Sequence, residues 1–322
     1  MQPPTIAENL LLHEKGRTMA INIRRLGYAL GAVVTGIDLR EPLDDRTVET
    51  LKDVWLDRTL LYFPDQDISA QDLARFAHYF GDSEQLPLRN HHADVPEVEI
   101  LTNQTANGIE WDGYKNGQDW HSDRSYTTSP TAAIVLLSKT IPEVGGDTLF
   151  ANMYMAYDML SPKMKSIVDD LYAVHDRDLP LIFRGGIIPA EVQGKMQKAS
   201  AKFASGEIPI AQPIARVHAE TGRRSLYLGK RVREIVGMTE EESRPLVEFL
   251  ARHAVQNEFT YRHRWHVNDL LFWDNRCTMH NALLDYDLAN DARTLLKCAL
   301  TIKGKSETGR PYVKDEATMV PA

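Results

Sequence analysis

Alternation of apolar and polar residues near the amino terminus predicts the first β-structure of the chain. Residues 21–39 alternate in this way around Gly27, Gly31 and Gly36, which indicates a hairpin. The other predicted strands are short apolar runs bounded by turn residues: 60–63, 98–102, 132–138, 148–151, 225–229, 259–265, 270–273 and 294–303.

Fewer segments carry helical periodicity. Residues 69–80 place Leu73, Phe76 and Phe80 on one side of a helix. Thr239, with Glu242 three residues later, forms the sequence of a capping box. The predicted helices are 46–58, 69–80, 152–172 with a start at Ser161-Pro162, and 239 to about 254.

Many short strands with a few outer helices predict a mainly β (α+β) protein built as a β-sandwich or jelly roll. We expect a flexible amino-terminal arm over residues 1–18 and one domain over 19–322. Residues 180–213 are rich in Gly, Lys and Ala without clear periodicity, so we expect a lid or insert there.

Composition narrows the class of protein. Hydrophobic residues make up 43% and charged residues 25%, as in a soluble globular protein. No apolar run reaches the roughly 18 to 20 residues that cross a membrane, and a signal-peptide pattern is absent. Two cysteines favour a reducing cytoplasm over a disulfide framework. A net charge of −8 opposes nucleic-acid binding. We expect a small-molecule substrate and a homo-oligomer.

A His-x-Asp pair at His121 and Asp123 is the first candidate for metal chemistry. On a strand, residues two apart project to the same face, so both side chains can reach one ion. The same spacing recurs at His92 and Asp94, and a solvated loop histidine beside an acidic residue is the alternative interpretation of either pair. Trp120, which precedes the first pair, can pack beside a pocket.

His280 is the candidate third ligand. Two histidines and one carboxylate on one face of a metal leave three positions open, which is the facial triad of non-haem Fe(II) oxygenases. The alternative is a hydrogen-bonded histidine at the rim of the core. Asp274 and Asn275 can orient the ligands or cap a turn.

Arg293 precedes an apolar strand and needs an anionic partner if it is buried, because an unpaired buried charge is costly. A dicarboxylate ligand could supply that partner through a bidentate contact. A salt bridge to Asp285, Asp287 or Asp291 is the other solution.

Over residues 21–304 the chain resembles the TauD/TfdA family of Fe(II)- and 2-oxoglutarate-dependent dioxygenases. Each motif is modest alone, but their order and spacing are specific. The matching motifs are Gly-Ile-Asp-Leu at 36–39, Trp-His-Ser-Asp at 120–123, Gly-Gly-Asp-Thr at 145–148, and Trp-Asp-Asn-Arg at 273–276 leading to His280.

The resemblance implies a double-stranded β-helix of the jelly-roll, cupin-like type. It implies iron held by His121, Asp123 and His280, with 2-oxoglutarate chelating the metal. The far carboxylate of 2-oxoglutarate would then contact Arg293 and Thr148. O₂ would be the second cosubstrate, with succinate and CO₂ released as a small organic substrate is hydroxylated. Hydroxylation next to oxygen, sulfur or nitrogen would break that bond.

The substrate pocket departs from the family pattern. Lys297 stands where related members carry a second arginine, and Arg89 lies near the usual place of a substrate-contacting tyrosine. A lysine lacks the bidentate fork of arginine. Taurine is therefore not the expected substrate. Arg89, Trp120, Arg231 and Lys297 are the predicted substrate residues, for a small anionic compound.

Two other functions stay open at this point. The same cofactors support desaturation or other oxidative tailoring of a metabolite derived from an amino acid or fatty acid. A non-catalytic metal-binding jelly-roll protein would explain the three metal-ligand candidates but not Arg293 and Thr148.

Overall fold

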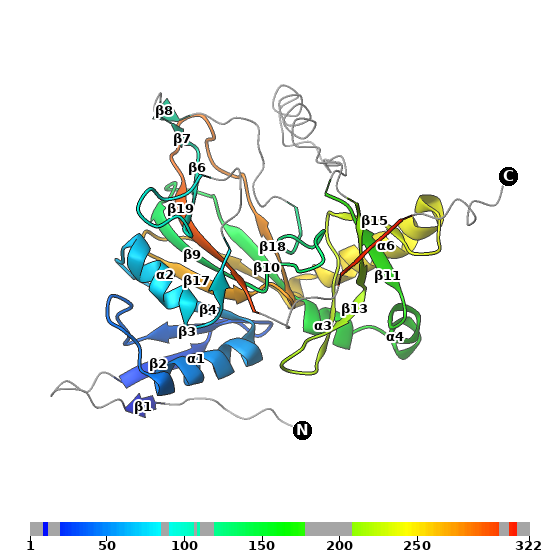
Figure 1. The fold of residues 1–322 in the computed structure, drawn as a ribbon, viewed down its shortest axis with the longest axis horizontal. Helices are drawn as coiled ribbons and strands as arrows, with labels where there is room; N and C mark the ends of the chain where they lie inside the picture. The colour runs from blue at the N-terminus through cyan, green and yellow to red at the C-terminus, as the bar shows by residue number, and fades with distance from the viewer. Residues whose placement is uncertain are drawn as a thin grey trace.

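The computed structural model describes residues 9–11, 20–84, 90–105, 108–109, 119–177, 208–302 and 309–313. Strands dominate this part of the chain and helices are few (Figure 1). The prediction of a mainly β protein with flanking helices is confirmed.

The largest sheet consists of β1 (Asn9–Leu11), β2 (Ala20–Arg25), β3 (Ala32–Thr35), β4 (Leu60–Phe63), β5 (Asp82–Ser83), β6 (Glu99–Thr102), β9 (Ala133–Thr140), β17 (Leu270–Asp274) and β19 (Thr294–Thr301). Its order is β1-β2-β3-β4-β17-β9-β19-β5, and β6 also pairs with β19. The pairs are antiparallel except β3 with β4, which run parallel. Successive residues of β17 pack into different cores, Phe272 on one face and Leu271 on the other, so the sheet is covered on both sides.

A second, smaller sheet carries several of the predicted site residues. It contains β10 (Thr148–Asn152) between β16 (Thr260–His263) and β18 (Thr278–Ala282). In its antiparallel register Phe150 lies opposite His280, and Thr148 lies opposite Ala282. The sequence pattern did not predict β18, because its polar and apolar residues do not form a recognisable apolar run.

A third group of elements follows β10. A four-stranded sheet runs in the order β15 (Val232–Ile235), β11 (Tyr172–His175), β12 (Ile210–Pro213) and β20 (Arg310–Pro311). β13 (Ala215–Val217) and β14 (Arg224–Leu226) form an antiparallel ribbon. A separate ribbon of β7 (Gln104–Thr105) and β8 (Gly108–Ile109) precedes β10 in the chain. The helices of this group are α3 (Met153–Asp158), α4 (Pro162–Val168) and α6 (Glu240–Ala254), followed by the 3-10 turn η1 (Asn257–Phe259) (Figure 1).

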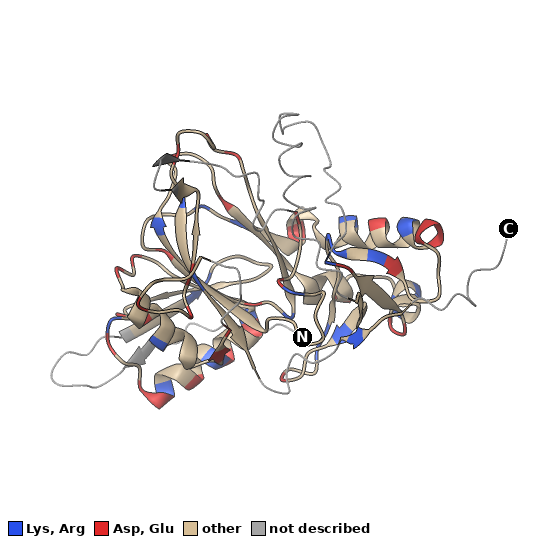
Figure 2. Ribbon diagram, turned by 45° about the horizontal axis from the view of Figure 1, so that its top comes forward, with Lys and Arg blue, Asp and Glu red and all other residues tan. Residues whose placement is uncertain are grey.

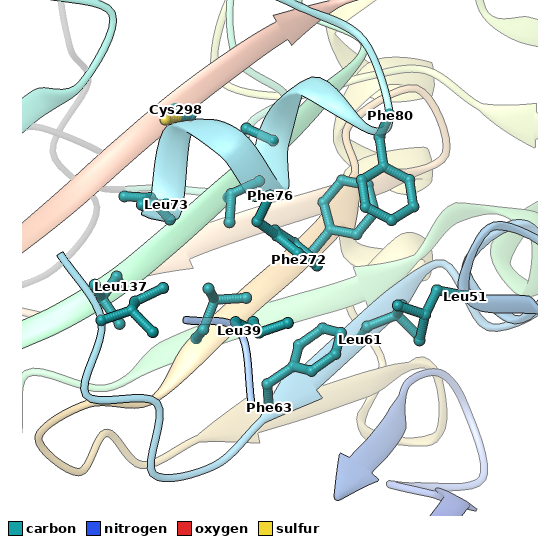
Figure 3. Close-up of a cluster of buried hydrophobic side chains, with 14 of the residues drawn as sticks. Leu39, Leu51, Leu61, Phe63, Leu73, Phe76, Phe80, Leu137, Phe272 and Cys298 are labelled. Carbon is teal, nitrogen blue, oxygen red and sulfur yellow. The ribbon is translucent and has the colours of Figure 1, made fainter. Parts of the chain in front are cut away.

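The main core lies between the large sheet and the helices α1 (Asp45–Arg58) and α2 (Ala70–His78). Phe76 of α2 and Phe80, just beyond the end of α2, project toward Phe272 of β17 (Figure 3). The Trp55 ring of α1 stacks on Phe272 with centroids 4.7 Å apart. This packing fixes the end of β17, from which the chain continues to β18.

Local sequence signals set most helix ends. Thr239 and Glu242 form the predicted capping box of α6, and Ser69 with Asp72 forms another at α2. The single helical pattern over 152–172 is divided in the structure: α3 ends at Asp158, and Ser161 caps a separate α4.

Parts of the predicted arm and insert are described. β1 lies within residues 1–18 and pairs with β2, and β12 lies within residues 180–213 and pairs with β11. The remaining residues of both segments lie outside the described part of the chain. None of the helices described is long and apolar enough to cross a membrane. Figure 2 shows Lys and Arg interspersed with Asp and Glu over the helices and loops of the described residues.

Candidate metal and cosubstrate site

Two backbone hydrogen bonds join the segments that carry the predicted histidine ligands. The N–H of His121 donates to the carbonyl oxygen of His280 at 3.1 Å, and the reverse bond measures 2.9 Å. The two residues form an isolated antiparallel bridge at β18. The fold thus brings together residues that lie far apart in the sequence.

The side chains of His121, Asp123 and His280 converge. Asp123 Oδ1 lies 3.2 Å from His121 Nε2 and 3.8 Å from His280 Nε2. One potential ligand atom from each residue lies within 4.8 Å of the other two. Both histidines are buried. Two imidazole nitrogens and one carboxylate in this arrangement can hold a divalent metal and leave further coordination positions open.

The protonation states suit metal binding. Burial lowers the pKa of His121, and burial together with the His121 charge lowers that of His280 well below its usual value. Burial alone would raise the pKa of Asp123, but Lys297 and the two imidazoles hold it well below the usual range. Neutral imidazoles and an ionised carboxylate are the forms that bind metals.

Hydrogen bonds outside the three side chains orient them. His121 Nδ1 lies 2.8 Å from the carbonyl oxygen of Asp119. A carbonyl accepts only, so Nδ1 carries the proton and the lone pair of Nε2 faces Asp123. The side chain of Asn275 accepts from the N–H of Asp123 at 2.9 Å and donates to its carbonyl at 3.0 Å. Asn275 therefore fixes the backbone of Asp123, which answers the question the sequence left open for this residue.

Arg293 is partly buried, and the environment of its guanidinium group favours an anionic ligand. Its Nε donates to the carbonyl oxygen of Gly146 at 3.1 Å. One terminal nitrogen is buried with no hydrogen-bond partner. Burial lowers the pKa of Arg293, and the nearby charges of Asp147 and Asp285 offset this only in part. No ion pair joins it to Asp285, Asp287 or Asp291 within the described residues, so the salt-bridge alternative is not supported.

Gly146 makes room for this arginine. Its φ is +70°, and an added Cβ would lie 3.2 Å from Arg293 Nε. Its neighbour Gly145 has φ +80°, and a Cβ there would lie 2.0 Å from the carbonyl oxygen of Asp285. The Gly-Gly pair of the sequence motif is therefore required by the backbone and by close packing.

Thr148 lies two residues beyond Gly146, at the start of β10, and is buried. Its hydroxyl oxygen accepts a hydrogen bond from Trp265 Nε1 at 3.0 Å. The hydroxyl proton is then directed to a different acceptor. Sequence reasoning missed Trp265, because a tryptophan near the end of a predicted strand resembles ordinary core.

Lys297 lies beside the three candidate ligands. Its Nζ donates to Asp123 Oδ2 at 2.7 Å and lies 3.8 Å from Glu99 Oε2. The structure thus places this predicted substrate residue in contact with a candidate metal ligand.

The other predicted substrate residues differ in position. The Arg231 guanidinium donates to the carbonyl oxygen of Arg177 and lies 5.5 Å from the centre of the Tyr126 ring. Trp120 packs against the apolar cluster around α3 and α6, and its carbonyl accepts from the N–H of Lys230 at 2.9 Å. Arg89 lies outside the described residues.

Two further residues near the site escaped the sequence analysis. The backbone of Gly229 packs on the metal-ligand segment: a Cβ there would lie 2.9 Å from the carbonyl oxygen of Trp120 and 3.1 Å from His121 Cα. Burial raises the pKa of Tyr227 to about 12, and the charge of Asp123 acts in the same direction. Their only sequence signal was the end of the predicted strand 225–229.

A second group of potential ligands, His218, Asp274 and Cys277, is also buried. Arg276 occupies both carboxylate oxygens of Asp274, at 2.9 and 2.6 Å. Burial raises the pKa of the Cys277 thiol well above its usual value. A bound guanidinium and a protonated thiol do not suit a cation. The His92 and Asp94 pair belongs to neither group of potential ligands found among the described residues.

Comparisons with known proteins agree with this geometry. The family model described as taurine catabolism dioxygenase TauD, TfdA family matches residues 22–299. An alkylsulfatase of Acinetobacter baylyi is 30% identical over 305 residues, which cover 94% of this chain and 91% of the relative. An alpha-ketoglutarate-dependent 2,4-dichlorophenoxyacetate dioxygenase of Cupriavidus pinatubonensis is 32% identical over 295 residues, covering 88% and 98%.

A solved structure is similar in fold. The crystal structure of AAD-2 in complex with Mn(II) and N-oxalylglycine superimposes with a TM-score of 0.70 at 28% identity. The match covers 89% of this chain and all of the other one.

Proposed function

This chain belongs to the TauD/TfdA family of 2-oxoglutarate-dependent non-haem iron dioxygenases, and we propose that it hydroxylates a small anionic organic compound. The family uses Fe(II), 2-oxoglutarate and O₂. Succinate and CO₂ would be the coproducts. The observation that carries the proposal is the convergence of His121, Asp123 and His280.

We assign the iron to these three side chains. Their donor set suits Fe(II): two neutral imidazoles and one carboxylate on a single face. When bound, iron with 2-oxoglutarate and O₂ supplies the oxidising chemistry. Asn275 fixes the backbone of Asp123, and Asp119 fixes the imidazole tautomer of His121. An aspartate at position 123 favours oxygenation over halogenation, which would need space for a halide.

Arg293 and Thr148 would hold the far carboxylate of 2-oxoglutarate. The support is the buried guanidinium nitrogen without a partner and the hydroxyl that Trp265 leaves ready to donate. A carboxylate between them would compensate the buried charge through charge-assisted hydrogen bonds. The Mn(II) and N-oxalylglycine named for the similar structure are a metal and a dicarboxylate, which agrees with this assignment.

The architecture proposed for this site is a double-stranded β-helix within a single domain, residues 19–322. Its support is the position of the candidate ligands where β18, paired with β10, meets the His121 segment.

For the substrate we propose the alkyl sulfate or aryloxyalkanoate class. Relatives bear the names alkylsulfatase and 2,4-dichlorophenoxyacetate dioxygenase. Hydroxylation of the carbon next to the ester or ether oxygen would leave two oxygens on that carbon. The adduct would collapse to a carbonyl compound and release sulfate or a phenol. Trp120 and Arg231 are proposed to border this pocket, together with Arg89.

Two measurements test the function. Anaerobic addition of Fe(II) and 2-oxoglutarate should produce a metal-to-ligand charge-transfer band, which His121→Ala should abolish. A panel of alkyl sulfates, aryloxyalkanoates and sulfonates is then scored by substrate-dependent succinate release. Absence of the band in the wild-type protein would favour a non-catalytic metal-binding protein. Succinate release accompanied by a desaturated product would favour the oxidative-tailoring alternative.

A further inference from the structure

The carboxylate of Asp123 divides its two oxygens between different partners. Oδ1 faces the imidazoles of His121 and His280, at 3.2 and 3.8 Å. Oδ2 accepts a hydrogen bond from Lys297 Nζ at 2.7 Å. The oxygen that faces the potential metal position is therefore a different one from the oxygen that forms the ion pair.

The ammonium group of Lys297 also lies near a second carboxylate, that of Glu99. In the pairing of β19 with β6, Lys297 lies directly opposite Glu99. Glu99 is buried, and its Oε2 lies 3.8 Å from Lys297 Nζ. The strand pairing fixes both backbones, so the ammonium group is held between Glu99 and Asp123.

We propose that Lys297, backed by Glu99, is a positioning residue that restricts Asp123 to one-oxygen coordination of the metal. The inference rests on the proposed iron site. An ammonium ion on Oδ2 competes with the metal for that oxygen and disfavours rotation of the carboxylate into a two-oxygen chelate. One more coordination position is then left for the cosubstrate, O₂ or water.

This role differs from substrate recognition. A lysine whose only role is to bind a substrate anion would affect substrate binding. It would leave the metal site of the substrate-free protein unchanged. Here the ammonium contacts Asp123 without any substrate, and two carboxylates already surround it. Replacement of Lys297 should therefore change the metal site of the substrate-free protein.

The experiment measures how Asp123 binds Co(II) in the absence of substrate. Difference infrared spectra of the Co(II)-loaded minus the metal-free protein, with ¹³C in the aspartate carboxylates, report the asymmetric and symmetric carboxylate stretches. A wide frequency separation between the asymmetric and symmetric stretches is typical of one-oxygen coordination. A narrow separation is typical of chelation through both oxygens. The variants are Lys297→Met, Lys297→Arg and Glu99→Gln. Lys139→Met on β9 is the control, since Lys139 pairs with Asp67 and Asn268.

We expect the separation to narrow in Lys297→Met and partly in Glu99→Gln, and to stay wide in Lys297→Arg and Lys139→Met. Circular dichroism and the melting temperature of each metal-free variant establish that it is folded. An unchanged separation in folded Lys297→Met would overturn the inference and leave the iron site intact. A raised KM for substrate with unchanged spectra would instead make Lys297 a substrate-binding residue. If wild-type protein gave no Co(II)-dependent carboxylate bands, the proposed iron site itself would fail.

Discussion

The indole N–H of Trp265 donates to the hydroxyl oxygen of Thr148 at 3.0 Å, and both residues are buried. An indole N–H can only donate, so the hydroxyl must accept from it. The hydroxyl proton is left for a second acceptor, which in the proposed site is the far carboxylate of 2-oxoglutarate. Trp265 would thus orient a group that binds the cosubstrate without touching the cosubstrate itself.

Replacement of Trp265 by Phe should weaken 2-oxoglutarate binding. Loss of one orienting hydrogen bond is worth about 1 kcal/mol, or roughly a fivefold rise in the dissociation constant. Thr148→Val should have at least as large an effect, because it removes the hydroxyl itself. Since both changes act through one hydroxyl, the double variant should bind 2-oxoglutarate as Thr148→Val does. Additive losses in the charge-transfer titration would show that Trp265 acts by another route.

The replacement Arg293→Leu should weaken 2-oxoglutarate binding without lowering the stability of the protein. One guanidinium nitrogen is buried without a hydrogen-bond partner, and burial lowers the pKa of Arg293, so removal of this side chain should not lower the melting temperature of the metal-free protein. The same change should weaken 2-oxoglutarate binding by about 2 kcal/mol or more, which is at least roughly 30-fold. Calorimetry of melting and of 2-oxoglutarate binding gives the two quantities. A marked drop in melting temperature would indicate that Arg293 has a structural partner.

Local signals in the sequence predicted much of this fold. Apolar runs predicted β4, β9 and β17, and the capping box at Thr239 placed the start of α6. These elements could be predicted because they depend on interactions within a few residues or on a run of residues that are all buried. The strands β11, β12, β15 and β18 were missed, because their stability depends on partners that are distant in the sequence. The three-residue strand β13 was also missed, although its partner β14 follows it closely in the sequence.

The residues of the candidate site also fall into those that the sequence predicted and those that it did not. His121, Asp123, His280 and Arg293 could be selected because metal and anion chemistry demands particular residue types. Residues that act by position alone carried no such signal. Trp265 and Gly229 are such residues, and their supporting contacts depend on pairings across 117 and 108 residues. Asn275 was named as a residue that could orient the ligands or cap a turn, and its contact with Asp123 across 152 residues decides between the two. Lys297 was predicted to contact substrate, and only the three-dimensional arrangement shows its contact with Asp123.

Gly229→Ala should damage the metal site more than a comparable glycine replacement elsewhere. Its φ is +143°, and a Cβ would press on Trp120 O at 2.9 Å and His121 Cα at 3.1 Å. Gly222, with φ +67° and no atom within 4 Å of the added Cβ, is a control for a glycine replacement at positive φ without a steric contact. Strain alone costs on the order of 1–3 kcal/mol. We expect a larger loss of stability for Gly229→Ala, and weaker Co(II) binding in that variant alone. Equal Co(II) affinity in the two variants would contradict this expectation.

Buried neutral histidines should make the metal-free protein sensitive to mild acid. Burial lowers the pKa of His175 to about 3, with the charge of Arg216 acting in the same direction. In the unfolded chain a histidine binds a proton near pH 6.5. Between these values the unfolded state holds a proton that the native state lacks, so protons favour unfolding. Stability is therefore full above pH 6.5 and falls as the pH is lowered toward 3.

The contribution of His175 can be measured by its replacement with Gln, which retains a polar group for the contact with Ser125 Oγ, 2.9 Å away in the native protein. Well below pH 6.5 one such histidine lowers the free energy of unfolding by about 1.4 kcal/mol per pH unit. Urea titrations of the metal-free protein between pH 7 and 5 should give a shallower slope for His175→Gln than for wild type. His266→Gln, at a side chain that is 78% exposed, serves as the control and should keep the wild-type slope. Equal slopes for wild type and His175→Gln would mean that His175 is already protonated in the native protein, or gains a proton without a cost to folding.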